Sequence, residues 1–425
     1  MTNFVLKGDI CHSITSKTLE TAHNAYLVCL DGLSAGIFQT LPEQYKALPL
    51  MDHTNHLILP GLTDLHIHAP QFTFRSLGMD LELIDWLNTH TFPEEARYAD
   101  LAYADHAYQA FVQDLRQGPT TRTNIFATRH VPATIRLMDL LEDSGLITTV
   151  GKVNMDRNAP DPLREQDAAA SLADTQTWLR EINGRYTRTS PILTPRFIPA
   201  CSDALMAGLG QIQRQWNLPV QSHLSENKQE ITWVKDLVPE AESYAHAYYQ
   251  HGLFGGDVPT VMAHCVWPSE EELTLMQAQK IWVAHCPQSN INLSSGIAPI
   301  RKFLDLNIPV GLASDMAGGV HTSIFRAISD AIAVSKLYWR LMDQTAQPLT
   351  LEEAFYLATC GGGSFFGKVG NFQPGYDLDA LIIDDSTLTP PRENLPLPDR
   401  LTRVIYLSEN RHIQKKYVQG LEIAL

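Results

Sequence analysis

Short apolar runs alternate with longer amphipathic stretches along most of this chain of 425 residues. Eight of these runs have the length and punctuation of strands, and each ends in a polar residue or a turn. They span residues 61–68, 122–127, 149–155, 191–197, 218–224, 260–265, 281–286 and 308–315. Strands that alternate with helices pair in parallel, and eight such units close a TIM-type (β/α)8 barrel with its active site at the carboxyl ends of the strands. The pattern therefore predicts an α/β fold built on one large barrel.

The two ends of the chain have a different pattern, of β character without intervening helices. Near the start lie NAYLVCL and AGIFQT, and near the end lie NFQPGYDLDALIID and RVIYLSENRHIQKKYVQGLEI, with turn pairs at Pro374-Gly375 and Gln419-Gly420. We expect these segments to pair into one small discontinuous β domain. The predicted division is residues 1–60 and 371–425 for the small domain and 61–370 for the barrel.

Composition and charge narrow the class of protein. Hydrophobic residues make up 44% of the chain and charged residues 19%, which is typical of a globular protein. The net charge of -15 repels phosphate backbones and anionic lipid, so neither nucleic acid nor a membrane is an expected partner. The six cysteines include no close pair, and no apolar leader or membrane-length run is present. We expect thiols without disulfide bonds in a cytoplasmic protein.

A His-x-His pair, His66 and His68, ends the first strand of the predicted barrel. Residues two apart on a strand point to the same side, so both imidazoles can reach one metal ion. Such a pair is more often structural when it occurs alone, but His223 ends the fifth run and Asp315 ends the eighth. Closure of the barrel would bring all four to one rim, although His223 alone would pass for a core histidine and Asp315 for a helix cap. Three imidazoles and one carboxylate suit Zn²⁺ or Fe²⁺ with one position open to water.

Two further residues are candidates for proton transfer at that rim. Glu226 follows His223 by three residues, where its carboxyl group could lie over a metal-bound water, and His264 ends the sixth strand, where it could contact the same water or an oxyanion. The alternative for Glu226 is a solvated residue at a helix start. His285 and His321 are interpreted as structural.

The chain resembles the guanine deaminases of the amidohydrolase superfamily from about residue 56 to its end. HxH and the Asp after the eighth strand are common to the whole superfamily, whereas Gln71, Arg196-Phe197 and Glu226 are the more specific marks. The matching stretches are PGLTDLHIHAPQF (60–72), HTFPEE (90–95), GKVNMDRNAPD (151–161), TPRF (194–197), SHLSEN (222–227), AHC (263–265), AHCPQSNINLSSG (284–296), SDMAGG (314–319) and LATCGGGSFFG (357–367).

The resemblance implies a role for each candidate residue. It assigns one zinc ion per chain to His66, His68, His223 and Asp315, and the surroundings of the purine to Gln71, Arg196, Phe197, Glu226 and His264. The expected reaction is guanine plus water to xanthine plus ammonia. A metal would lower the pKa of its water towards roughly 7, Asp315 would take the released proton, and hydroxide would attack C2. Glu226 would protonate N3 and then help the amine to leave as ammonia. A homodimer is the expected assembly.

The shapes of three side chains favour guanine independently of that resemblance. A guanidinium is a rigid fork of donors, so Arg196 could read the adjacent acceptors O6 and N7. The Gln71 amide offers a donor and an acceptor, which suits the mixed edge of N1-H and O6. Phe197 could stack on the ring, and core packing is its equally weighted alternative.

Four other functions are alternatives to this one. A related aminohydrolase could act on a pterin, an 8-oxopurine or a triazine. A binuclear hydrolase would need a bridging lysine after the fourth strand, where the chain has Thr194-Pro195-Arg196-Phe197 instead. The cytidine deaminase type would need H-x-E with P-C-x-x-C, which the chain lacks. A catalytically inactive barrel that serves as a scaffold is the alternative from outside the enzymes.

Overall fold

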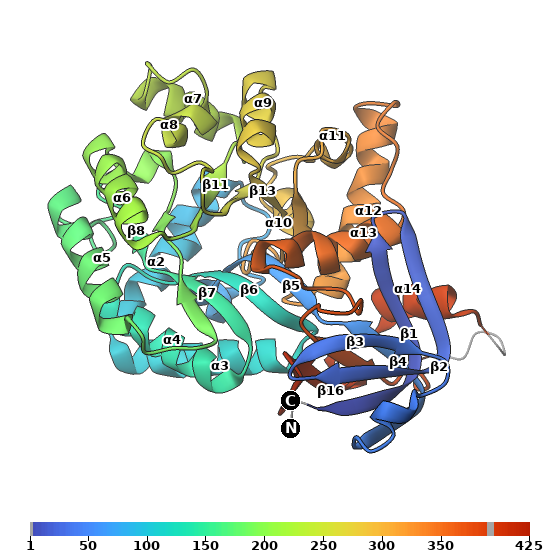
Figure 1. The fold of residues 1–425 in the computed structure, drawn as a ribbon. Coiled ribbons are helices and arrows are strands. Elements are labelled where there is room, and N and C mark those ends of the chain that lie inside the picture. The colour runs from blue at the N-terminus through green and yellow to red at the C-terminus, as the bar shows by residue number, and fades with distance from the viewer. Residues whose placement is uncertain (1–2, 389–394) are drawn as a thin grey trace.

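The computed structural model describes residues 3–388 and 395–425. A barrel surrounded by helices packs beside a β sheet built from both ends of the chain (Figure 1). Residues 1–2 and 389–394 belong to the predicted terminal segments and lie outside the described residues. The predicted α/β fold with a barrel and an additional β unit is confirmed.

Parallel strands form the barrel as two four-stranded sheets, ordered β5-β6-β7-β9 and β11-β12-β13-β14. Their bounds are β5 (Leu62–His68), β6 (Thr120–Phe126), β7 (Ile147–Gly151), β9 (Thr189–Pro191), β11 (Val220–Leu224), β12 (Thr260–His264), β13 (Trp282–His285) and β14 (Val310–Leu312). A parallel bridge between Leu193 and Val220 joins the sheets on one side. On the other side, the Asp315 N–H donates to the His66 carbonyl (2.9 Å) and the His68 N–H to the Met316 carbonyl (3.2 Å). These contacts close the barrel.

Several barrel strands are shorter than the apolar runs that predicted them. The run 191–197 splits into β9 and β10 (Thr194–Pro195), and β10 pairs with β8 (Val153–Asn154). Pro191 and Pro195 have no N–H group, so neither can donate to a continuous ladder. The last run also stops early, at Leu312, and Asp315 follows in a left-handed conformation with φ 46°. Asp315 therefore lies just beyond its strand rather than on it.

Helices cover the outside of the barrel, and their apolar faces pack on the strands. These helices alternate with the strands, as the sequence predicted. The bounds of the helices are α3 (Leu101–Gln117), α4 (Val131–Ser144), α5 (Ala168–Ile182), α6 (Asp203–Trp216), α7 (Lys228–Leu237), α8 (Tyr244–Tyr249), α9 (Glu270–Gln279), α10 (Pro287–Asn292), α11 (Ile300–Asp305), α12 (Ile324–Leu341) and α13 (Leu351–Tyr356). After β5 a chain of short segments crosses the barrel mouth before α3: η2 (Ala69–Phe74), α1 (Leu83–Trp86), the π-helical η3 (Leu87–Thr91), α2 (Phe92–Ala96) and η4 (Arg97–Ala99).

A seven-stranded sheet combines the two ends of the chain in the order β17-β16-β15-β4-β1-β2-β3. Its strands are β1 (Phe4–Thr15), β2 (Thr18–Leu30), β3 (Leu33–Phe38), β4 (Leu50–Pro60), β15 (Ala380–Ile383), β16 (Ile413–Val418) and β17 (Leu421–Ile423). The antiparallel pairing of β15 with β4 joins the C-terminal part to the N-terminal part. Gln419 and Gly420 both have positive φ in the turn between β16 and β17, as a type I′ hairpin requires.

One part of the C-terminal segment is helical, where the sequence predicted β structure. The residues RVIYL lie in α14 (Leu397–Leu407). The buried side chains of this helix are Leu397, Leu401, Val404 and Ile405, which recur at the spacing of one helical face. The β propensity of Val404, Ile405 and Tyr406 was therefore overridden by packing with helical periodicity.

Two absences hold for the part of the chain that the structure describes. No disulfide bond joins any of the six cysteines, as expected. None of the described helices is long and apolar enough to cross a membrane.

Candidate active site

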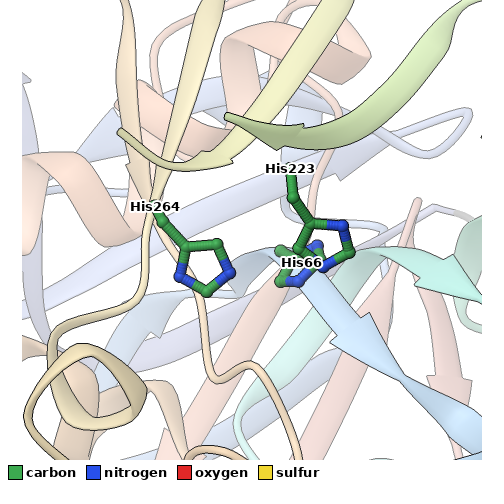
Figure 2. Close-up of side chains that lie close together, drawn as sticks. All are labelled: His66, His223 and His264. Atoms are coloured by element: carbon green, nitrogen blue, oxygen red, sulfur yellow. The ribbon is translucent and has the colours of Figure 1, made fainter. Parts of the chain in front are cut away.

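Three imidazoles meet at the carboxyl end of the barrel. His66 and His68 come from β5 and His223 from β11, and Figure 2 shows the rings of His66 and His223 close together, with His264 beside them. The His68 Nε2 atom lies 3.2 Å from the Nε2 atom of His66 and 3.2 Å from that of His223. All three side chains are buried or nearly so. The parallel strands have thus brought together residues that are 155 positions apart.

Asp315 completes this cluster from the segment after β14. Its Oδ1 atom lies 3.1 Å from His66 Nε2 and 3.6 Å from His68 Nε2. Burial by itself would raise the pKa of Asp315, but the neighbouring imidazoles, His66 above all, hold it well below its ordinary value. The carboxylate is therefore ionised beside the imidazoles.

The donor atoms of this cluster are arranged to bind a metal ion rather than to form hydrogen bonds with one another. The His223 Nδ1–H donates to the Arg196 carbonyl (2.6 Å), which leaves its Nε2 lone pair pointing into the cluster. Burial lowers the pKa of His68 and of His223 well below the ordinary value, so both rings are neutral. Three converging nitrogens and a carboxylate oxygen form a donor set typical of Zn²⁺. Three overlapping groups among the described residues could hold an ion: His66-His68-Asp315, His66-His223-His264 and His264-Cys286-Asp315.

Glu226 and His264 face each other next to the cluster. The Glu226 Oε2 atom lies 3.5 Å from His264 Nε2, and its Oε1 accepts a hydrogen bond from Ser295 Oγ (3.0 Å). Burial raises the pKa of Glu226 to about 7, against the opposing effect of His264. His264 donates from Nδ1 to Asn290 Oδ1 (2.9 Å), and its Nε2 atom also lies 3.8 Å from Asp315 Oδ2. Although burial opposes it, the charge of Glu226 raises the pKa of His264 above its ordinary value.

Glu230 is a site residue that the sequence analysis did not name. It lines the cavity, and its Oε2 atom accepts hydrogen bonds from the backbone N–H groups of Glu226 (3.1 Å) and Asn227 (3.3 Å), while Tyr244 donates to Oε1 (2.7 Å). Asn227 and Glu230 form a capping box at the start of α7. The Asn-x-x-Glu spacing was a readable signal for this helix start. Glu230 therefore holds the backbone of Glu226 in place.

Gln71 and Arg196 line the same cavity. Both side chains contact Glu95, which the sequence analysis did not identify as a functional residue. The Arg196 Nη1 and Nη2 atoms donate to the two oxygens of Glu95 at 2.6 and 3.2 Å, and Gln71 Nε2 donates to Oε1 at 2.9 Å. Part of the Arg196 fork is thus used within the protein, and its remaining N–H groups are the ones that can face a ligand.

The rest of the cavity wall is mostly apolar. Its apolar residues are Leu83, Trp86, Leu87, Phe197 and Leu293. Phe197 also packs in a cluster with Phe92 and Phe126, and its ring meets that of Trp233 edge to face at 6.1 Å. Phe197 thus both lines the cavity and packs in the core, the two interpretations that its sequence context allowed.

Eight of the nine residues predicted from the sequence line this one cavity, and His66 joins it through its contacts with His68 and Asp315. His285 lies outside the lining. It is buried, its pKa is lowered to about 3 by burial, and neither ring nitrogen has a hydrogen-bond partner among the described residues. His321 is exposed and also lies outside the lining.

Comparison with known proteins places this arrangement in a family. The model of the amidohydrolase family matches residues 57–423. Guanine deaminase of Dictyostelium discoideum is 36% identical over 99% of this chain and 98% of its own length. The Escherichia coli guanine deaminase is 35% identical over 87% of this chain and 83% of its own length.

A solved structure agrees with these relatives along the whole chain. Guanine deaminase from C. acetobutylicum, solved with guanine bound in its active site, superposes with a TM-score of 0.96. It is 45% identical and covers 99% of this chain and 100% of its own. Atrazine chlorohydrolase from Arthrobacter aurescens, with 15% identity and a TM-score of 0.85, shares the fold. This chain therefore belongs to the amidohydrolase family and, given such identity over its full length, to the guanine deaminases within it.

Proposed function

We propose that this chain hydrolyses guanine to xanthine and ammonia with one zinc ion per chain. The observation that carries the proposal is that one cavity combines three kinds of group. It holds a metal-type cluster, a buried carboxyl with a pKa near 7 next to an imidazole, and the amide and guanidinium of Gln71 and Arg196. The relatives named guanine deaminase, one of which binds guanine in its active site, support the same substrate.

His66, His68, His223 and Asp315 are the residues that would hold the metal ion. When bound, a zinc ion supplies Lewis-acid chemistry and lowers the pKa of a water towards about 7. Fe²⁺ has compatible ligand preferences, so the donor set alone does not choose between the two metals.

Three side chains carry the protons in the proposed mechanism. Asp315 is ionised before the reaction and accepts one proton from the attacking water. Glu226 in its acid form donates a proton to N3 while the water oxygen bonds to C2. The resulting Glu226 carboxylate takes the remaining proton from the hydroxyl at C2 and passes it to the amine, so that the C2=O bond forms as the C2–N bond breaks and ammonia leaves. The proton held by Asp315 then returns to Glu226. In its imidazolium form His264 carries a proton on both nitrogens, so Nε2 donates to the oxygen that develops at C2 while Nδ1 donates to Asn290 Oδ1.

Gln71, Arg196 and Phe197 bind the purine in this proposal. Gln71 and Arg196 present donors and one amide acceptor to the O6, N1 and N7 edges, and Phe197 contacts the ring face. A buried polar site of this kind discriminates strongly against a ring that leaves its groups unpaired.

The test is ammonia release by the purified protein from guanine, a pterin, 8-oxoguanine and an aminochlorotriazine, together with metal analysis. Guanine is expected to give the highest kcat/KM, with about one zinc per chain. Chelation should abolish turnover, and re-addition of zinc or iron should show which metal restores it. A higher kcat/KM for another ring would replace guanine as the substrate. A protein that binds no metal and releases no ammonia would be the inactive scaffold.

We also propose an assembly and a division into domains. We propose a homodimer, which sedimentation velocity would separate from a monomer of 47.5 kDa. We also propose that residues 1–60 and 371–425 form one domain and 61–370 another, which limited proteolysis would test.

A further inference from the structure

Glu95 lies behind two residues of the cavity wall and is absent from the wall itself. It belongs to α2, one of the short segments that cross the barrel mouth after β5. Its side chain is only 4% exposed. A buried carboxylate is costly unless it is fully paired, so its partners are the reason that it can be there.

Within the part of the chain that the structure describes, both hydrogen-bond partners of the Glu95 carboxylate, Gln71 and Arg196, line the cavity. Oε2 accepts from Arg196 Nη1 at 2.6 Å, and Oε1 accepts from Arg196 Nη2 at 3.2 Å and from Gln71 Nε2 at 2.9 Å. The far side of the Gln71 amide is also held, because the Ala317 N–H donates to Gln71 Oε1 at 3.2 Å. Glu95 and Ala317 thus determine which end of the amide is oxygen and which is nitrogen.

We propose that Glu95 is a positioning residue that sets the donor and acceptor pattern read by the purine. One carboxylate aligns the guanidinium plane of Arg196 and prevents the Gln71 amide from reversing. The inference rests on the proposed function insofar as Gln71 and Arg196 are the groups that read the ring. It adds the residue that makes their pattern specific, although this residue does not touch the ring.

The donor and acceptor pattern of Gln71 and Arg196 depends on a carboxylate at residue 95 and not only on a side chain of that shape. Glutamine at this position carries an NH2 group in place of one oxygen, and this group faces a donor in either orientation. If it replaces Oε2 it faces Arg196 Nη1, and if it replaces Oε1 it faces Arg196 Nη2 and Gln71 Nε2. The first orientation breaks the two-point alignment of the Arg196 guanidinium. In the second, reversal of Gln71 relieves the contact with its amide, but it turns the amide donor towards the Ala317 N–H and exchanges donor and acceptor on the cavity side.

The variant Glu95→Gln tests this with two ligands in the zinc-loaded protein. Hypoxanthine carries O6 and N1-H, whereas unsubstituted purine lacks both. The ratio of the Kd for purine to the Kd for hypoxanthine therefore reports how strongly the protein binds the O6 and N1-H edge. Wild type should bind hypoxanthine more tightly than purine. In Glu95→Gln the ratio of the Kd for purine to the Kd for hypoxanthine should fall by about tenfold or more, since the misaligned groups leave a buried hydrogen bond to the ligand unmade. The measurement is isothermal titration calorimetry with each ligand.

Glu94→Gln is the matched control. Glu94 is the preceding residue, is also buried, and accepts from Thr73 Oγ1 (2.5 Å), Arg97 Nη1 (3.1 Å) and Tyr103, none of which lines the cavity. Loss of this carboxylate should lower the melting temperature without changing the ratio of the two Kd values. A general structural effect of losing a buried carboxylate would change both variants alike.

A paired exchange keeps the experiment decisive if Glu95→Gln does not fold. Gln71→Glu combined with Glu95→Gln retains one carboxylate and one amide at the same two positions, so the net charge is unchanged. It should fold and still lose the preference for hypoxanthine, because the amide donor of residue 71 is gone. An unchanged ratio in either folded variant, or no preference in wild type, would overturn the inference. Failure of wild type to deaminate guanine, with the ratio behaving as described, would refute the proposed reaction and leave the role of Glu95 standing.

Discussion

Replacing Glu226 by glutamine removes one titratable proton and almost nothing else. The side chain is 6% exposed, and its contact with Ser295 Oγ at 3.0 Å can be kept by an amide oxygen. The loss in the free energy of unfolding should therefore stay near 1 kcal/mol, the value of one ordinary hydrogen bond. A carboxyl whose pKa burial raises to about 7 can both give and take a proton near neutral pH, and an amide can do neither. We expect kcat to fall by 10²–10⁴-fold, which is about 3–5.5 kcal/mol in the activation barrier.

The assay is ammonia release at saturating guanine, with zinc content and guanine binding measured on the same preparation. Zinc should be retained, since Glu226 is not one of the predicted metal ligands, and the Kd for guanine separates any loss of binding from the loss of proton transfer. Glu353→Gln is the control: this buried carboxylate pairs with Arg301 at 2.7 and 2.8 Å outside the cavity, so its loss should leave kcat unchanged. A Glu226→Gln protein with more than about a tenth of wild-type kcat would show that Glu226 does not carry the proton.

Three further variants test other parts of the molecule. His223→Ala should bind less than stoichiometric zinc, and a full zinc complement by metal analysis would remove His223 from the ligand set. Arg196→Lys keeps the charge but loses the planar pair of donors to Glu95, so kcat/KM for guanine should fall at least about tenfold. Guanosine should be a poor substrate of wild type. An unchanged kcat/KM for guanine in the variant, or equal kcat/KM for guanosine and guanine in wild type, would refute the role of Arg196 in binding guanine. Burial lowers the pKa of Lys416 to about 7, so above that pH the unfolded chain binds more protons than the folded chain does. The free energy of unfolding of wild type should therefore rise by about 1.4 kcal/mol per pH unit from pH 7 to 9, relative to that of Lys416→Met. Equal pH slopes in urea unfolding would contradict the Lys416 prediction.

The meeting of His66, His68, His223 and Asp315 was predictable because its signals are local. Each of these predicted ligands stands at or just after the end of an apolar run, and a parallel barrel brings such positions to one rim. Glu95 was not predictable in this way, because it lies in a series of short helical and π-helical segments without a clear period. Its pairing with Arg196 spans 101 positions and depends on how those segments cross the barrel mouth. The helix α14 was missed for the opposite reason, since local β propensity contradicted a helical burial period.

Barrel closure also relies on a residue whose type gives no hint of its role. Asp64 lies in the middle of β5 and is fully buried. Its Oδ1 atom accepts from the N–H groups of His66 (3.2 Å) and Ser314 (3.1 Å), and its Oδ2 atom accepts from Ser314 Oγ (2.5 Å). One carboxylate thus joins the first strand to the segment that carries Asp315, within two residues of a predicted ligand on each side. Because Asp315 has positive φ, its conformation needs such external support. The geometry of the cluster of His66, His68, His223 and Asp315 therefore depends on the contacts between β5 and the residues after β14 as much as on these four side chains.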